Sequence, residues 1–280
     1  MTPFFYSVFK GDEEMKKTIF SCAVLFSTMF VLPCLGADYT GMWWDAEKPG
    51  TGVYIDYTEG PNNLCGSWYL YDQRGNPLWV TFLGTLSGKV FTTGLYKFTG
   101  PPMGGMWDNS AVRGERTGNV TIDFSNPDKL VMTYEIERES GTLNLTRFSS
   151  QECAGSLWWD VEKQGQGVAH FHFAGAEGED LTGLVWYVYD TEGNPIWYTA
   201  TGNATATTFD AWQFTGPPLG ETWDTSLLKK EKAGTIKAEF NQLLFTTERL
   251  PKLDMDYTIR DISGHLSLEP FMCPVAVTDR

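Results

Sequence analysis

The sequence predicts an all-β protein with two tandem domains, each an antiparallel up-and-down barrel of about eight strands. Ten of the eleven tryptophans form pairs whose members lie 115 to 118 residues apart, and a period of this length indicates a duplicated domain. Short segments that alternate apolar and polar residues, separated by Gly, Pro, Asn and Asp, indicate strands and turns. The pairs are Trp43/Trp158, Trp44/Trp159, Trp68/Trp186, Trp79/Trp197 and Trp107/Trp223. β-Sandwiches are the alternative architecture.

Residues 1–37 are expected to lie outside both domains. Two lysines precede an apolar run over residues 18–32, and small residues follow it at Gly36 and Ala37, which is the pattern of a secretory signal peptide. This pattern begins at Met15, so we expect translation to start there. The sequence therefore predicts an exported chain, either secreted or periplasmic.

The first repeat is expected over residues 38–150 and the second over residues 151–280. In residues 120–124 apolar side chains alternate with polar ones, which is typical of a strand with one face in the core and the other in water. The segments 72–76 and 190–194 predict tight hairpins, with a Gly where the turn needs a positive φ. About eight strands of this kind fit in each repeat, which suits a barrel that closes on itself.

Tryptophan and tyrosine supply the candidate binding surfaces. Neighbouring residues on a strand point to opposite faces, so each Trp-Trp pair is expected to straddle a barrel wall. Both faces of the segments 68–71 and 186–189 are apolar, so one face would fill the barrel and the other would meet the sister repeat, a ligand or a partner protein. The candidate ligand-binding residues are Trp44, Trp68, Tyr69, Tyr71, Trp79, Trp107, Trp159, Trp186, Tyr187, Tyr189, Trp197 and Trp223.

The segments 98–108 and 214–224 match at 8 of 11 positions, the densest identity between the repeats. Loops usually diverge faster than strands, so this match indicates a shared role. In one interpretation the segment shapes the mouth of each barrel, with Trp107 and Trp223 as lids. In the other interpretation it is a stiff Pro-Pro corner that a tryptophan plugs.

Two carboxylates stand two residues apart in each repeat, Asp45 with Glu47 and Asp160 with Glu162. On an extended segment such a pair shares one face, which would suit an acid and a base or part of a calcium site. A lysine follows each pair directly, and this favours a solvated turn.

His170 and His172 would share one face of a strand and are considered as metal ligands. Their counterparts in the first repeat are Ile55 and Tyr57, so the pair occurs in one repeat only and no metal site is predicted. The chain has three histidines, no Gly-x-Ser-x-Gly turn and no phosphate-binding glycine loop. We therefore expect neither catalysis nor a cofactor.

The net charge of −14 bears on the possible partners. Nucleic acids and anionic membrane surfaces are bound through Lys and Arg, so this charge disfavours both. We expect no nucleic-acid partner, and no membrane insertion once the signal peptide is removed.

Three cysteines remain after the expected signal peptide, Cys65, Cys153 and Cys273, and export would place them in an oxidising compartment. The first and last strands of a closed antiparallel barrel pair with each other. Cys153 precedes the first strand of the second repeat and Cys273 follows its last strand. These two are therefore predicted to form a disulfide, which leaves Cys65 as a free thiol.

The motif Trp-Tyr-x-Tyr-Asp-x-x-Gly-x-Pro-x-Trp occurs at residues 68–79 and again at residues 186–197, downstream of a Trp-Trp pair and a Gly-x-Gly. This arrangement resembles repeats of secreted proteobacterial proteins, a likeness that implies export and no particular activity. The opening of the first repeat, residues 41–43, is similar to that of avidin-like and lipocalin-like barrels, in which an arginine tends to pack over the tryptophan. Arg147 stands at the matching place in the first repeat, and Pro270 in the second.

These observations predict an exported, non-enzymatic protein that binds a small molecule, a glycan or a protein through aromatic surfaces or pockets. The first alternative is a structural or adhesive envelope protein whose aromatic residues only join repeats or subunits. The second is a hydrolase that uses the paired carboxylates. An open barrel interior would favour binding, a packed interior would favour the structural alternative, and the hydrolase needs those carboxylates in a cleft.

Overall fold

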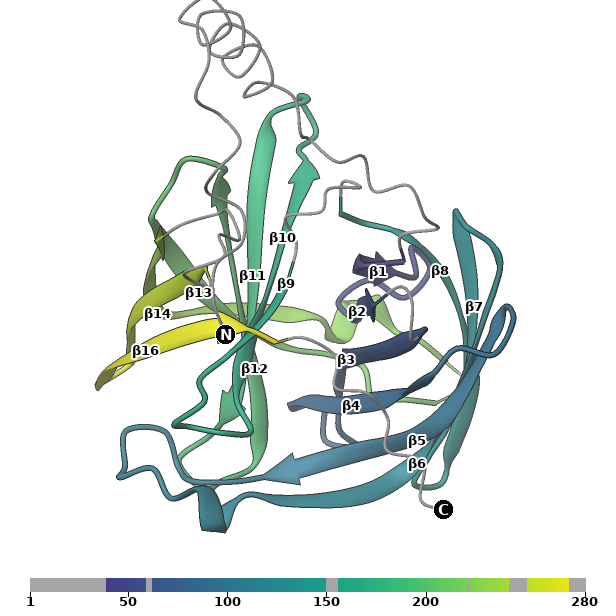
Figure 1. Ribbon diagram of the computed structural model, residues 1–280, viewed down its shortest axis with the longest axis horizontal. Coiled ribbons are helices and arrows are strands. Elements are labelled where there is room, and N and C mark those ends of the chain that lie inside the picture. Colours follow the sequence, from purple (N-terminus) through teal and green to yellow (C-terminus); the bar gives the residue numbers. More distant parts are fainter. Residues whose placement is uncertain (1–38, 59–61, 150–155, 221, 242–250, 272–280) are drawn as a thin grey trace, which may run out of the picture. The chain divides into compact units, whose positions relative to one another are not determined.

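The computed structural model describes residues 39–58, 62–149, 156–220, 222–241 and 251–271. These residues form two closed, antiparallel, eight-stranded barrels, which confirms the predicted fold class (Figure 1). Both barrels belong to one compact unit of the chain, residues 37–280. The predicted signal peptide lies outside the described residues and stays a prediction.

Each strand of the first barrel pairs with the next strand along the chain, and the first strand pairs with the eighth to close the sheet. Its strands are β1 (Gly41–Trp44), β2 (Gly52–Thr58), β3 (Asn63–Tyr71), β4 (Pro77–Thr85), β5 (Val90–Thr99), β6 (Arg113–Asn126), β7 (Lys129–Ile136) and β8 (Glu139–Arg147). A short 3₁₀ helix, η1 (Asn109–Ala111), precedes β6.

The second barrel repeats this order and closes through the pairing of its first strand with its last. Its strands are β9 (Ser156–Trp159), β10 (Gly167–Ala174), β11 (Asp180–Tyr189), β12 (Pro195–Asn203), β13 (Thr208–Thr215), β14 (Lys229–Asn241), β15 (Lys252–Ile259) and β16 (Ile262–Pro270). The helix η2 (Thr225–Leu227) precedes β14, as η1 precedes β6.

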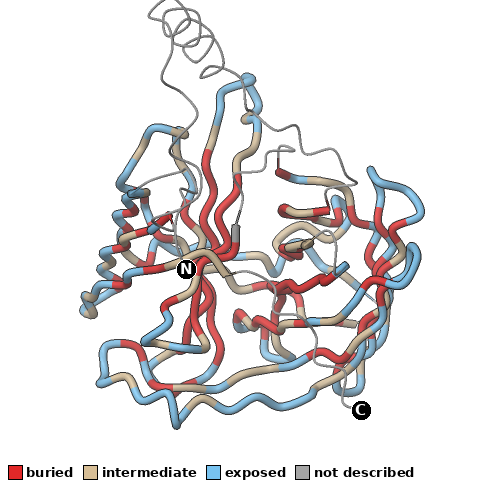
Figure 2. Tube along the Cα trace, in the orientation of Figure 1, coloured by how far each residue is buried: buried red, intermediate tan, exposed pale blue. Residues whose placement is uncertain are grey.

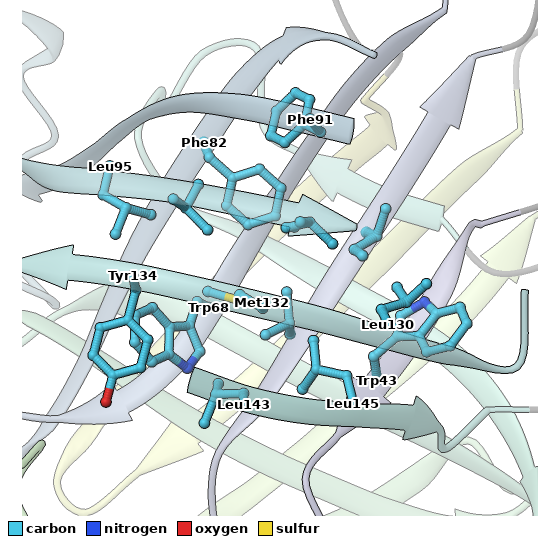
Figure 3. Close-up of a cluster of buried hydrophobic side chains, with 14 of the residues drawn as sticks. Trp43, Trp68, Phe82, Phe91, Leu95, Leu130, Met132, Tyr134, Leu143 and Leu145 are labelled. Carbon is cyan, nitrogen blue, oxygen red and sulfur yellow. The ribbon is translucent and has the colours of Figure 1, made fainter. Parts of the chain in front are cut away.

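The alternation in the sequence decides which side chains enter each barrel. Burial along β7 alternates residue by residue, with Leu130, Met132 and Tyr134 on the inner face. Figure 3 shows these side chains together with Trp43 and Trp68, both of which are fully buried. Side chains therefore fill the interior of the first barrel, and a second cluster of buried apolar residues does the same in the second barrel.

The hairpins predicted at residues 72–76 and 190–194 are confirmed. The Asp72 carboxylate accepts hydrogen bonds from two backbone N–H groups of its own turn, each at 2.8 Å, and Gly75 adopts the positive φ of 81° that the turn requires. Asp190 makes the same bonds in the second barrel. These hairpins fix β3 beside β4 and β11 beside β12.

The Trp-Trp pairs straddle the barrel walls as predicted. Trp43 and Trp158 belong to the two barrel cores, whereas Trp44 and Trp159 are half-buried on the outside. The guanidinium of Arg147 lies 4.3 Å above the Trp43 ring, so the arginine–tryptophan contact is present in the first barrel. Pro270 faces Trp158 in the second barrel, which therefore closes without this contact.

Cys65 does not have the predicted free thiol, because it is disulfide-bonded. It lies on the outer face of β3, among aromatic residues of both repeats. Cys153 and Cys273 lie outside the described residues. If the signal peptide is removed as expected, these two are the only cysteines left as partners for Cys65, and they cannot then pair with each other.

Candidate functional site

The outer aromatic residues of the two repeats pack against each other in one cluster, which we call the inter-barrel cluster. It explains why β3 and β11 are buried on both faces along most of their length (Figure 2). Its buried members are Met42, Tyr54, Cys65, Tyr69, Tyr71, Trp79, Leu157, Ala169, Phe171, Val185, Tyr187, Tyr189 and Trp197. The outer apolar face of β3 and that of β11 therefore pack mainly against the sister repeat.

Matched tryptophans exchange equivalent hydrogen bonds across this cluster. Trp79 Nε1 donates to the carbonyl oxygen of Val188 at 3.0 Å, and Trp197 Nε1 donates to that of Leu70 at 3.2 Å. Both bonds are buried, where an unpaired indole N–H would cost about 1–3 kcal/mol. The two barrels thus meet through the same surface of each repeat, which is the arrangement of a twofold dimer within one chain.

The matching corner segments cross from each barrel to the other. Met103 leaves the first barrel and packs in the core of the second, while Leu219 leaves the second and packs in the core of the first. The N–H of Gly100 donates to the carbonyl oxygen of Gly193 at 3.1 Å, and the equivalent bond in the other direction measures 3.0 Å. Each corner therefore plugs the sister barrel.

The interpretation of Trp107 and Trp223 as lids of their own barrels is wrong. The Trp107 ring lies 6.0 Å from that of Tyr189, and the Trp223 ring lies 6.4 Å from that of Tyr71. Trp223 Nε1 also donates to the carbonyl oxygen of Pro49 at 3.2 Å. These tryptophans hold each stiff corner against the sister barrel, which agrees with the structural interpretation of the corner.

The tyrosine hydroxyls of this cluster stay neutral over the ordinary pH range. Burial is the largest cause that raises their pKa above the usual value of 10.0; a nearby tyrosine adds to it in Tyr69, and in Tyr187 a nearby tyrosine and the carboxylate of Asp56 do so. The tyrosines affected are Tyr69, Tyr71, Tyr187 and Tyr189. They act as apolar rings with a hydrogen-bonding tip, and they bring no negative charge to the cluster.

The solvated turn that the sequence predicts is confirmed for the glutamates Glu47 and Glu162, which are exposed, but not for the aspartates. Asp45 is 2% exposed, and its two oxygens accept hydrogen bonds from the backbone N–H groups of Glu47 and Asn144, both at 3.0 Å. Asp160 is 5% exposed and accepts from the N–H of Glu162 at 2.9 Å. Both aspartates satisfy backbone donors of the turn after the first strand, a structural role that gives no support to the hydrolase alternative.

The two histidines share one face of β10, as predicted, and that face points into the second barrel. His170 is 2% exposed, its Nε2 lies 3.0 Å from Thr182 Oγ1, and its ring centre lies 4.9 Å from that of His172. Within the described ranges no group of three or more His, Cys, Asp or Glu is placed to hold a metal ion. This pair therefore carries no metal proposal.

A cavity of about 500 Å³ lies along one side of the inter-barrel cluster. We call it the seam cavity. Strands β3 to β5 of the first barrel form one wall, and β9, β11 and the turn before β10 form the other. Among the described residues that line it, none is charged. Its aromatic lining residues are Trp79, Phe82, Tyr96, Phe98, Trp159, Tyr187 and Phe271.

The equivalent place on the other side of the cluster is filled. There the Phe171 ring lies directly over Gly183, where an added Cβ would come within 2.5 Å of it, and 6.0 Å from the ring of Phe148. The residues that correspond to Phe171 and Gly183 in the first repeat are Asp56 and Cys65, which pair across β2 and β3. Phe171 is thus one of the residues by which the two sides differ.

A larger cavity of about 570 Å³ lies between the two hairpins. Charged side chains of both signs line it, and several of them already belong to the hairpins, as Asp72 and Asp190 do. Asp and Glu outnumber Lys and Arg in its lining, six to two, and none of the buried, unpartnered side-chain atoms of the described residues belongs to a lining residue. The seam cavity is therefore the stronger candidate.

The structure divides the twelve candidate binding residues into three groups. Trp79, Trp159 and Tyr187 line the seam cavity. Trp68 and Trp186 are fully buried inside the barrels, so their assignment as ligand-binding residues is wrong. The remaining seven pack between the barrels or against an outer phenylalanine: Trp44, Tyr69, Tyr71, Trp107, Tyr189, Trp197 and Trp223.

Sequence reasoning missed the other residues of the cavity. Tyr96 and Phe98 lie on β5 and Phe271 directly follows β16, and nothing in the sequence distinguishes them from core aromatics. Gln166 stands where the first repeat has Thr51, one polar residue in place of another. The exchange of Thr for Gln between the repeats was the one available indication.

The chain matches no model of a known protein family, no curated protein and no solved structure. No helix within the described ranges has the length and apolar character that a membrane span requires. The function must therefore be argued from the geometry of the site.

Proposed function

We propose that the protein is an exported, non-enzymatic binding protein, and that its ligand is a small, uncharged, largely apolar molecule held in the seam cavity. The cavity itself carries the proposal. Its volume of about 500 Å³ falls within the range of small-molecule sites, roughly 300–1,000 Å³, and aromatic rings from both barrels line it. Export rests on the signal-peptide pattern.

The lining favours an uncharged molecule over a glycan or a protein. An ion would lose its hydration without a described countercharge in the lining to replace it. A glycan would bring many hydroxyls, whereas the polar lining side chains apart from the tyrosines are those of Ser67, Thr81 and Gln166 together with the Cys65 disulfide. A protein partner would bury roughly 800 Å² on each side, more than a concave site of this size offers.

The structural alternative has an observation of its own in its favour. Most of the outer aromatic residues are occupied in joining the two barrels, and side chains pack the barrel interiors. A protein whose aromatic residues serve only this purpose would bind no small molecule in a saturable way. The two functions therefore differ in a result that can be measured.

The test uses the neutral dye N-phenyl-1-naphthylamine, whose fluorescence rises in apolar surroundings. We expect saturable binding of one dye per chain. Thr81→Trp, which places an indole in the cavity, should weaken binding at least about tenfold because it fills the site. Thr199→Trp is the matched control, because Thr199 has the same place in the second repeat and does not line the cavity.

Circular dichroism and thermal melting would establish that both variants fold. Binding that Thr81→Trp leaves unchanged would contradict the assignment of the site. No saturable binding to the unmodified chain would favour the structural alternative.

A further inference from the structure

Gln166 is a largely buried polar residue in the wall of the seam cavity. It is 3% exposed, it stands in the turn before β10, and it lines the seam cavity. Its amide atoms are not among the buried side-chain atoms of the described residues that lack a hydrogen-bond partner, so the amide is not sealed away from the cavity. The amide is therefore a polar group of the cavity wall with which a polar substituent of a ligand can pair.

The corresponding residue of the first repeat shows what this position does for the fold. Thr51 Oγ1 donates to the carbonyl oxygen of Tyr69 at 2.6 Å and accepts from Trp68 Nε1 at 3.0 Å. It thereby satisfies the indole N–H of a fully buried core tryptophan. A threonine at this position therefore has a clear structural purpose.

Gln166 does not take over that purpose. Trp186, the counterpart of Trp68, has a buried Nε1 with no hydrogen-bond partner among the described residues. The second repeat thus lacks the bond that the first repeat makes, and it has a longer polar side chain in the cavity wall instead. A residue that leaves a core donor unsatisfied contributes little to the fold, which favours a role toward a ligand.

We propose that Gln166 recognises a polar substituent on the ligand of the seam cavity. The inference rests on the proposed function. The amide has two donors and one acceptor, so it pairs with a hydroxyl, carbonyl or amide group. The ligand class is then an uncharged aromatic ring compound with one such substituent, the ring lying against Trp79 or Trp159 and the substituent directed to Gln166.

The test compares naphthalene with 2-naphthol, two compounds of nearly equal shape that differ by one hydroxyl. Isothermal titration calorimetry on the full chain should show that 2-naphthol binds about 2- to 12-fold more tightly, the ratio expected from one net hydrogen bond. Gln166→Met, which keeps the length of the side chain without the amide, should reduce this ratio to about one. Its affinity for naphthalene should stay within about twofold.

Two further variants separate the amide from other causes. Gln166→Thr introduces the residue that the first repeat has at this place, so it should fold, and it too should lose the preference. Ser67→Ala removes a hydroxyl from the opposite wall of the cavity and should keep the preference.

The outcomes distinguish this inference from the function on which it rests. If neither compound nor the dye binds the unmodified chain, the proposed function fails. If both compounds bind the unmodified chain equally, or if Gln166→Met retains the preference, the cavity binds rings and the role of Gln166 is refuted. Loss of the preference in Ser67→Ala alone would also refute it.

Discussion

Leu219→Ala should destabilise the barrel to which Leu219 does not belong in sequence. The side chain comes from the corner after β13 of the second barrel, yet it is 8% exposed and packs in the core of the first. Truncation of a buried leucine costs about 2–5 kcal/mol, because transfer free energy and packing are both lost. Leu219 lies at a barrel end, where its surroundings relax more easily, so we expect about 2–3 kcal/mol.

Hydrogen–deuterium exchange with peptide resolution would locate the effect. Protection should fall in strands of the first barrel near Leu78 and Ile136, which border the same cavity as Leu219. Leu227→Ala is the control from the same connection, since Leu227 is 46% exposed and its truncation should change stability by less than about 0.5 kcal/mol. A loss of protection confined to the second barrel, or a near-neutral Leu219→Ala, would refute the crossed corners.

Three further predictions follow from burial. In denaturant titrations, Trp43→Ala should lower the free energy of unfolding by about 3–5 kcal/mol and Trp44→Ala by much less. Similar losses for the two variants would contradict the assignment of Trp43 to the inner face and Trp44 to the outer face of the barrel. Burial raises the pKa of Tyr198 to about 12, so the folded state holds the hydroxyl proton more tightly than the unfolded state. The free energy of unfolding should therefore keep its full value below pH 10 and fall as the pH rises toward 12, with the ionisation followed by tyrosinate absorbance. A free energy of unfolding that stays constant over this interval would argue against the buried hydroxyl. Peptide mapping without reduction should find a disulfide between Cys65 and Cys273, because Phe271 lines the same cavity as Cys65 and precedes Cys273 by two residues. A disulfide between Cys153 and Cys273 would contradict this and support the pairing predicted from the sequence.

The fold could be predicted from the sequence because its causes are local or repeated. Strand alternation, the Asp-x-x-Gly-Asn hairpins and the tryptophan spacing all operate within one repeat. The closed barrels and the inward position of Trp43 could be predicted from them. The same alternation showed that Tyr69 and Tyr71 face away from the core.

The site could not be predicted because its causes join residues from different repeats. Nothing in the sequence indicates that Met103 and Leu219 enter each other's barrels. Asp45 and Asp160 were expected in water because a lysine follows each pair, yet backbone N–H groups of the turn determine their position. The seam cavity joins residues of both repeats, such as Trp79 and Trp159, and this contact is evident only once the two faces are placed together.

The most direct test of the account is a crystal structure of the full chain with N-phenyl-1-naphthylamine. The account predicts one dye molecule in the seam cavity, against Trp79 and Trp159, and none at the filled side beside Phe171. Dye inside a barrel, on both sides of the inter-barrel cluster, or nowhere in crystals soaked above the solution Kd would contradict it.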